Sequence, residues 1–406
     1  MKTLDTISDN IANTLLGCQD FLDSKKWASF EQSWRNSGDC KRWFSLKEDR
    51  HVMIDFADAS YSLETAHKIR TAMEWGTISP SVFMEKFDKN DMQKILNHRK
   101  RHYPYDSLDV NKIINCKSPK YNIVIPVKEN DGDLTRTNHL LTLCGYLLMC
   151  LRFKPDWSVT FVIQEDNNKM TDHLLGYLNK FKEKYGWENY NLFTIVKSHK
   201  FMKKSCCYNL ACKEIESKWQ INHDVDLLFT SHFVEGIEKF CNSGVKRFFQ
   251  PFVTGQVSQL THDETEYIIS LNSQGIMVSL EPLLRQNPPI PYTKAPGGSV
   301  VVSRDLMVEV GGYDPHIIEG YGPEDSMFWL KLELATLNPV GTGFDNVHLG
   351  GGEYSDIVQS QVLHFNHEHG IIDIDNAFIP FAYFVFLRYG DPKERKQFIE
   401  SLKGLL

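Results

Sequence analysis

The stretch Trp-Gln-Ile-Asn-His-Asp-Val-Asp-Leu-Leu-Phe-Thr, residues 219–230, decides the fold of this chain. It begins as a strand, passes through Asp224 and Asp226, and continues into the apolar run 227–229. In an extended backbone two residues that are two positions apart point to the same side, so we expect both carboxylates on one face. Paired carboxylates suit a hard divalent cation that also holds phosphate oxygens.

The Asp-x-Asp pattern carries little information alone, because the chain has two further copies, at Asp131/Asp133 and Asp373/Asp375. The copy at Asp224/Asp226 differs in its position at the end of a predicted strand in mid-chain and in the motifs that follow it. Those motifs decide between a metal site and an ordinary polar turn.

Strands and helices alternate in the sequence before the two aspartates. Tyr121–Val127 predicts a buried strand that enters a polar loop. The next elements are expected to be a helix over 135–153, a strand over 158–165, and helices over 171–185 and 205–218. This order predicts an α/β fold with a mostly parallel sheet wrapped by helices. Ligands bind beyond the carboxyl ends of such strands, and Asp224 and Asp226 fall near that edge.

Other segments are predicted more coarsely. Residues 1–118 are expected to be mostly helical. Residues 236–251 and 254–266 are expected to be rich in loops. The tail, 376–406, has an aromatic stretch followed by a charged helix from about Pro392.

Residues 295–313 carry a second group of motifs. Gly297 and Gly298 permit close approach of the backbone to a ligand. A strand follows, Ser303 is expected to cap a short helix, and Gly311-Gly312 to end it.

The segment Glu319-Gly-Tyr-Gly-Pro-Glu-Asp325 precedes another predicted helix. Glu324 and Asp325 open this helix, and acidic residues in a first turn often only complement the helix dipole. Gly320 and Gly322 lie on either side of Tyr321 and favour a tightly packed loop around the aromatic ring. A simple helix cap does not need such a loop.

The last polar cluster is Val362-Leu-His-Phe-Asn-His-Glu-His369, with three histidines within six residues. Histidines that follow an apolar strand have the character of metal ligands. The alternative is a run of surface histidines without a ligand.

Composition limits the classes of protein that fit. With 406 residues, 42% hydrophobic residues and a net charge of -7, the chain is typical of a globular protein without an overall field for nucleic acid or membranes. No signal peptide or bilayer-spanning run is seen, and the nine cysteines, with Cys206 next to Cys207, suit reduced thiols. A cytoplasmic protein without a membrane partner is expected. The basic and aromatic stretch His98–Tyr105 is either a solvated helix end or a phosphate-binding segment.

In this order the motifs resemble those of metal-dependent glycosyltransferases of the GT-A fold, and most of all the β-1,4-galactosyltransferase group with its galactosyl/N-acetylgalactosaminyl module. The resemblance covers residues 121–369 and lies in the order and spacing of the motifs. It implies a Rossmann-like catalytic domain over 119–370. Residues 1–118 would form an accessory or acceptor-binding region, and residues 371–406 a helical cover.

The resemblance also implies residue roles in binding a nucleotide-sugar donor. Ile125-Pro126-Val127 would line the base, with Lys128 beside it, and the helix start Tyr208-Asn-Leu-Ala211 would pack nearby. Asp224 would touch the ribose or the sugar. The backbone of Gly297 and Gly298 and the side chain of Tyr321 would lie close to the transferred sugar.

For catalysis, the resemblance makes Asp325 the general base and Glu324 a sugar- or acceptor-binding carboxylate. The metal ligands would be Asp226, His364 and His367. Because His364 replaces a methionine of the family, the set would hold two histidines and one aspartate, which suits Mn²⁺ and also borderline metals. Mg²⁺ is the alternative cation.

One departure affects the diphosphate. The family's arginine in the helix near the diphosphate falls on Leu210, which cannot contact phosphate. Lys203, Lys204 or Lys128 is the expected substitute.

The predicted function is transfer of a sugar from a nucleotide sugar, expected to be UDP-linked, to an acceptor hydroxyl with inversion. The acceptor is either a saccharide or a hydroxymethylated base in DNA, the latter reached through His98–Tyr105. Two alternatives stay open. One is a nucleotidyltransferase, which also uses paired aspartates and metals, and the other is a sugar-nucleotide-binding protein without activity.

Overall fold

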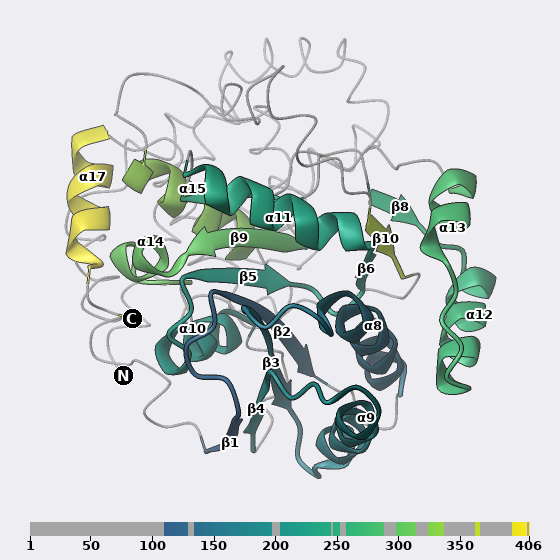
Figure 1. The fold of residues 1–406 in the computed structure, drawn as a ribbon. Coiled ribbons are helices and arrows are strands. Elements are labelled where there is room, and N and C mark those ends of the chain that lie inside the picture. The colour runs from purple at the N-terminus through teal and green to yellow at the C-terminus, as the bar shows by residue number, and fades with distance from the viewer. Residues whose placement is uncertain are drawn as a thin grey trace, which may run out of the picture. The chain divides into compact units, whose positions relative to one another are not determined.

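A computed structural model describes residues 109–128, 134–196, 204–244, 247–251, 257–287, 298–313, 324–336, 362–365, 392–403 and 406 (Figure 1). Four of the predicted site residues or stretches lie outside this part of the chain: His98–Tyr105, Gly297, Tyr321 and His367. The same holds for Lys203 and for most of the predicted N-terminal helical region.

The chain divides into two compact units. Among the described residues, one unit contains residues 324–331 and helix α17, Pro392–Ser401. The other contains the rest, and with it both aspartates.

A seven-stranded sheet forms the centre of this second unit, in the order β1-β4-β3-β2-β5-β9-β7. The strands β4, β3, β2 and β5 are parallel, β1 and β9 join them antiparallel, and β7 is antiparallel to β9. Five of the seven strands therefore run in one direction, which confirms the predicted α/β class. The strands are β1 Val110–Ile114, β2 Tyr121–Lys128, β3 Trp157–Gln164, β4 Tyr190–Ile195, β5 Trp219–His223, β7 Phe248–Phe249 and β9 Ser299–Ser303.

Edge strand β1 precedes residue 119, where the sequence places the start of the catalytic domain. It pairs along its whole length with β4. The sheet thus begins earlier than that boundary, while the role of the N-terminal region stays a prediction.

Three helices connect the parallel strands: α8, Thr135–Leu151; α9, Lys169–Tyr185; and α10, Lys204–Glu214. The chain steps from β2 through β3 to β4 on one side, then returns to place β5 on the other side of β2. Because such crossovers are right-handed, this reversal puts α8 and α9 on one face of the sheet and α10 on the other (Figure 1). The switch point of the sheet lies between β2 and β5.

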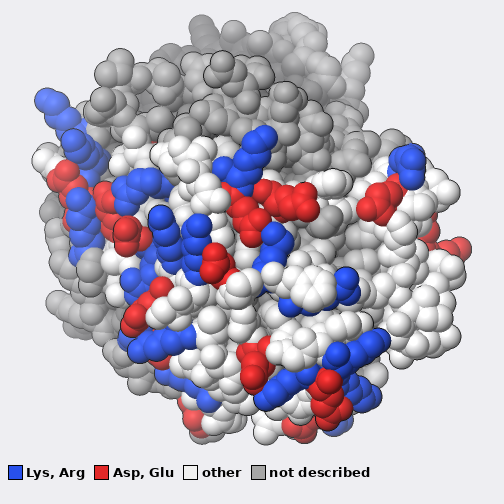
Figure 2. Space-filling view, in the orientation of Figure 1, with Lys and Arg blue, Asp and Glu red and all other residues white. Residues whose placement is uncertain are grey.

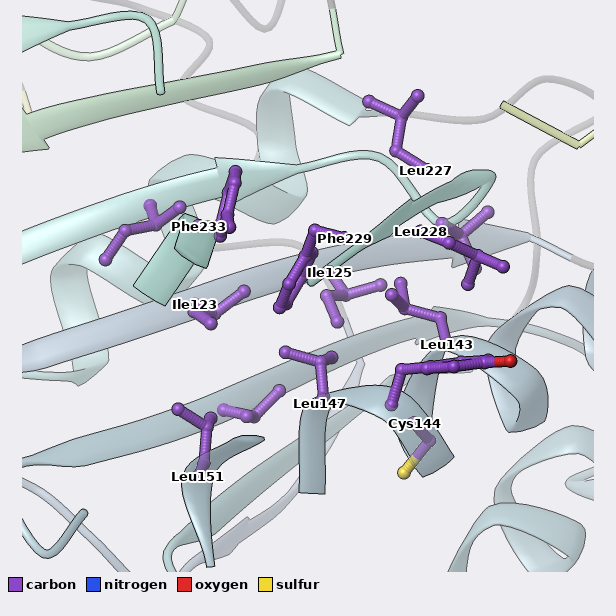
Figure 3. Close-up of a cluster of buried hydrophobic side chains, with 14 of the residues drawn as sticks. Ile123, Ile125, Leu143, Cys144, Leu147, Leu151, Leu227, Leu228, Phe229 and Phe233 are labelled. Carbon is purple, nitrogen blue, oxygen red and sulfur yellow. The ribbon is translucent and has the colours of Figure 1, made fainter. Parts of the chain in front are cut away.

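A second, three-stranded sheet begins directly after the two aspartates. It has the order β6-β10-β8, in which β10, Val362–His364, lies antiparallel to β6, Leu227–Phe229, and parallel to β8, Val257–Gln259. The side chains of β6 join the core between β2 and α8, where Phe229 lies near Ile125 and Leu147 (Figure 3). Burial of this apolar run holds the end of the aspartate segment in place.

Two helices overlap the regions expected to be rich in loops, over residues 236–243 and 262–266, so that part of the prediction was wrong. Helix α11, Ser231–Ser243, buries Phe233, Ile237 and Phe240 at helical spacing. Helix α12, His262–Ser273, begins with a capping box in which Thr261 accepts from the Glu264 N–H and Glu264 accepts from the Thr261 N–H. The apolar spacing of α11 and the capping box of α12 are both visible in the sequence. A further short helix, α13, spans Leu280–Gln286.

The elements predicted around residues 299–336 are confirmed. Ser303 accepts from the Leu306 N–H and caps α14, Arg304–Glu309. Gly311 and Gly312 follow with left-handed φ angles of 67° and 65°. Glu324 and Asp325 open α15, Glu324–Thr336.

No helix in the described part of the chain is long and apolar enough to cross a membrane.

Candidate functional site

The candidate site lies at the carboxyl ends of β2 and β5, next to the switch point of the sheet. Pro126 and Val127 are buried in β2, and Lys128 ends the strand half-buried. Strands β2 and β5 pair as far as Val124 and Asn222, so Asp224 continues β5 to the level of Pro126. Open α/β sheets bind ligands at this place.

The two aspartates lie in a turn, so the expectation of an extended backbone was wrong. The Leu227 N–H donates to the Asp224 carbonyl at 3.3 Å, which closes a four-residue turn. The Asp224 N–H donates to the Gly298 carbonyl at 2.8 Å. The turn brings Gly298, with its φ of 88°, against the aspartates and gives the two carboxylates different partners.

Asp224 contacts two side chains of α10. The Lys204 ammonium lies 2.8 Å from Oδ1 and 3.1 Å from Oδ2, and the Tyr208 hydroxyl donates to Oδ1 at 3.1 Å. Lys204 and Tyr208 are one helical turn apart, so they reach the same carboxylate. One of the three lysines named as substitutes for the missing arginine, Lys204, is thus beside Asp224.

Asp226 contacts a residue that the sequence analysis did not single out. Arg136 Nη1 donates to Asp226 Oδ2 at 3.0 Å, and the two side chains are only 24% and 14% exposed. Arg136 lies in the first turn of α8, which follows β2. A basic residue in the first turn after a parallel strand lies at the carboxyl edge of the sheet, and this position was the available signal.

The backbone places β10 against Asp226. The Phe365 N–H donates to the Asp226 carbonyl at 2.9 Å, and His364 is opposite Leu227 in the register of β10 and β6. The backbone of His364 is therefore next to Asp226 although the two are far apart in sequence. The side chain of His364 lies outside the described atoms. Among the residues that are described, no three or more His, Cys, Asp or Glu side chains form a group that could hold a metal ion.

Glu324 and Asp325 are half-buried in the first turn of α15. They belong to one compact unit of the chain, and Asp224 and Asp226 belong to the other. Their roles in acceptor binding and proton transfer stay predictions.

A buried polar network fixes α10 to the turn that ends α14. The Asn209 amide donates to the Tyr313 carbonyl, and its oxygen accepts from the Tyr313 N–H, both at 2.8 Å. The Asn222 amide of β5 donates to the Tyr313 hydroxyl at 3.2 Å. Tyr208, which holds Asp224, is the neighbour of Asn209 in the middle of α10, so the network sets the position of this part of the helix and not of its start, where the sequence had placed these residues. Leu210 is 3% exposed and faces the core, in agreement with the expectation that it contacts no phosphate.

His223 closes β5 just before the turn and is completely buried. Its Nε2 lies 3.0 Å from the Leu227 carbonyl, which can only accept, so Nε2 carries the proton in the neutral ring. Burial lowers the pKa of His223, while the hydrogen bond to Leu227 and the charges of Asp224 and Asp226 oppose that effect and Lys204 adds to it. The neutral ring is the form that fits the folded protein.

The stability of the protein is expected to fall as the pH drops below the ordinary histidine pKa of about 6.5, because the unfolded state then binds a proton that folded His223 resists. Above that pH, His223 makes its full contribution to the free energy of unfolding. Below it, this contribution falls by up to about 1.4 kcal/mol per pH unit. The measurement is urea unfolding from pH 8 to 5 for the wild type and His223→Gln, which keeps a donor for the Leu227 carbonyl. A difference in unfolding free energy that does not change between pH 7 and 5 would show that His223 makes no such contribution.

No family model matches this chain, and no curated protein matches it. Among solved structures, it is similar to the mannosyltransferase PcManGT of Pyrobaculum calidifontis in complex with GDP-Man and Mn²⁺, at 14% identity and a TM-score of 0.32, over 68% of this chain and 64% of that one. It is also similar to residues 1–349 of S. aureus TarS in complex with UDP-GlcNAc, at 16% identity and a TM-score of 0.33, over 53% of each chain. A mycobacterial protein matches at 12% identity and a TM-score of 0.31, over 64% of this chain and 70% of that one.

The first two similarities span less than two thirds of the other chain. TM-scores this low do not assign a fold or a function to this chain. The functional argument therefore depends on the chain's own residues.

Proposed function

We propose that this chain is a metal-dependent glycosyltransferase of the GT-A kind, related to the β-1,4-galactosyltransferase group, which transfers a sugar from a nucleotide sugar to an acceptor hydroxyl. The observation that carries the proposal is the turn at the switch point of the sheet. It holds Asp224 and Asp226 beside the carboxyl end of β2 and bonds the Asp226 carbonyl to the strand end that carries His364. Asp224, Asp226 and the backbone of Gly298 thus lie at the edge where α/β sheets bind nucleotides, which supports a donor site there.

The donor is proposed to lie along this edge. Pro126, Val127 and Lys128 would line the base, and Asp224, held by Lys204 and Tyr208, would bind the ribose or the sugar. The left-handed backbone at Gly298, with its neighbour Gly297, would lie close to the sugar, because a residue without a side chain lets the ligand approach. Tyr321 would contact the same sugar.

The residues at the turn suit a divalent cation in their chemistry. Asp226 offers a hard carboxylate oxygen, and the backbone brings position 364 next to it. Asp226, His364 and His367 would hold Mn²⁺ or Mg²⁺. A cation bound there stabilises the negative charge of the diphosphate as it leaves.

Asp325 is proposed to accept the proton of the acceptor hydroxyl as that hydroxyl attacks the sugar. Glu324 would bind the sugar or the acceptor. A single displacement from the face opposite the diphosphate inverts the configuration at the anomeric carbon.

The acceptor is proposed to be a saccharide. Figure 2 shows basic and acidic side chains interspersed over the described part of one face, whereas a DNA-binding face gathers basic side chains. Hydroxymethylated DNA, with His98–Tyr105 as its contact, is the second possible acceptor and is included in the test.

The test is a donor panel that includes UDP-GlcNAc, UDP-galactose and GDP-mannose, each with Mn²⁺ or Mg²⁺, followed by acceptor trials. We expect a UDP-sugar with Mn²⁺ to raise the melting temperature by several degrees, since a ligand that binds only the folded state stabilises it. The same donor should be hydrolysed slowly, and mass spectrometry should detect sugar on an oligosaccharide. A protein that neither binds nor turns over any donor would contradict the proposal. Release of pyrophosphate from a nucleoside triphosphate would favour the nucleotidyltransferase instead.

A further inference from the structure

Each aspartate of the turn is matched with one cation from the first turn of a different helix. Asp224 pairs with Lys204 of α10, and Asp226 pairs with Arg136 of α8. All four side chains are 14–25% exposed, so they are partly desolvated and still open to a ligand. Within these two ion pairs the negative and positive charges balance.

The balance within the Arg136–Asp226 pair affects how a cation can bind at Asp226. A divalent cation that binds alone at Asp226 brings two positive charges next to the Arg136 guanidinium, and like charges in a partly desolvated site repel. A diphosphate diester carries two negative charges, so a cation and a nucleotide sugar together add no net charge. The pair of ligands is therefore accepted more easily than either one alone.

Arg136 has the chemistry to move between the two partners. A guanidinium presents a planar fork of donors that binds carboxylate or phosphate oxygens, in either case with charge-assisted hydrogen bonds. The position from which a helix arginine was expected to reach the diphosphate is the buried Leu210, which leaves this requirement to other cations. Lys204 is less suited to it, because Lys204 and Tyr208 together fix the Asp224 carboxylate.

We propose that Arg136 is a diphosphate-binding residue that neutralises Asp226 in the free protein and exchanges this carboxylate for a phosphate when cation and donor bind together. The inference rests on the proposed function and adds a residue and an order to it. Arg136 competes with the cation for Asp226 and cooperates with it once the nucleotide is present. The two ligands thereby strengthen each other's binding by the same factor.

The experiment measures binding of Mn²⁺ alone, and of UDP-GlcNAc and GDP-mannose with and without Mn²⁺, by calorimetry for the wild type, Arg136→Gln and Arg136→Lys. Arg136→Gln should bind Mn²⁺ alone more tightly, by roughly 3- to 10-fold, because the competing charge is gone. It should bind the nucleotide with Mn²⁺ more weakly, by roughly 10- to 100-fold, because a charge-assisted contact is lost. Arg136→Lys should restore part of the nucleotide affinity. A purely structural role would weaken both.

The matched control is Arg247→Gln, which removes another arginine–carboxylate contact, from Arg247 Nη1 to Glu309 Oε2 at 2.9 Å, on the surface of the same unit. It should leave both affinities unchanged. Nucleotide binding by the wild type that Arg136→Gln does not alter, or losses of both affinities in that variant, would overturn the inference and leave the proposed function standing. Failure of the wild type to bind any nucleotide with Mn²⁺ would overturn both.

Discussion

Replacement of Asp226 by Asn is expected to abolish metal-dependent donor binding and turnover, with a loss of at least about 100-fold in the affinity for UDP or GDP with Mn²⁺. The reason is the loss of the carboxylate that would bind the cation directly. The turn itself should persist, because its hydrogen bonds use the carbonyls of Asp224 and Asp226, which the substitution does not touch. Calorimetry with Mn²⁺ and nucleotide, together with the melting temperature, measures both effects.

Two further carboxylate variants make this result specific. Asp224→Asn removes the negative charge that pairs with Lys204 and one of the two acceptor oxygens, so it should weaken nucleotide binding while Mn²⁺ still binds. Asp305→Asn changes an exposed carboxylate in the first turn of α14 and should have no effect on either ligand. If Asp226→Asn bound Mn²⁺ and nucleotide as the wild type does, the metal would lie elsewhere and the assignment of Asp226 would be wrong.

The fold was predictable from the sequence because its determinants are local. The apolar strand 121–127 and the helical pattern that follows it are periodic, and the structure reproduces them within a few residues as β2 and α8. The capping of α14 by Ser303 was predictable for the same reason. Helices α11 and α12 were not predicted, although the apolar spacing of Phe233 and Ile237 and the capping box at Thr261 are present in the sequence.

The site was predictable only in part, because its contacts join distant segments. The sequence identified Asp224 and Asp226 but not the turn that contains them or the bond from the Asp224 N–H to the Gly298 carbonyl. It did not identify Arg136, because an arginine in a helix is usually a solvent-exposed residue without a specific role. Only the order of the strands in the sheet brings α8 to Asp226. The return of β10 to Asp226 likewise needs the register of a second sheet.

Replacement of Gly312 by Ala is expected to destabilise the protein by about 3 kcal/mol, from two physical causes. The φ of 65° costs an L-residue roughly 1 kcal/mol. In addition, the new Cβ would lie 2.3 Å from Asn209 Oδ1 and 2.8 Å from its Cγ. Asn209 is fully buried and bonded twice to the backbone of Tyr313, so it can move away only by giving up hydrogen bonds worth roughly 1–3 kcal/mol. Urea unfolding measures the sum.

Gly186→Ala separates the two causes, since Gly186 has a φ of 68° and its added Cβ meets nothing within 4 Å. That variant should lose only about 1 kcal/mol. Asn209→Ala in the Gly312→Ala background removes the clash, so the double variant should be less destabilised than the sum of the single ones. Because Asn209 adjoins Tyr208, which holds Asp224, Gly312→Ala should also weaken nucleotide binding, whereas Gly186→Ala should not. Equal losses of stability in Gly312→Ala and Gly186→Ala would mean that Asn209 moves away without cost and does not fix the position of α10.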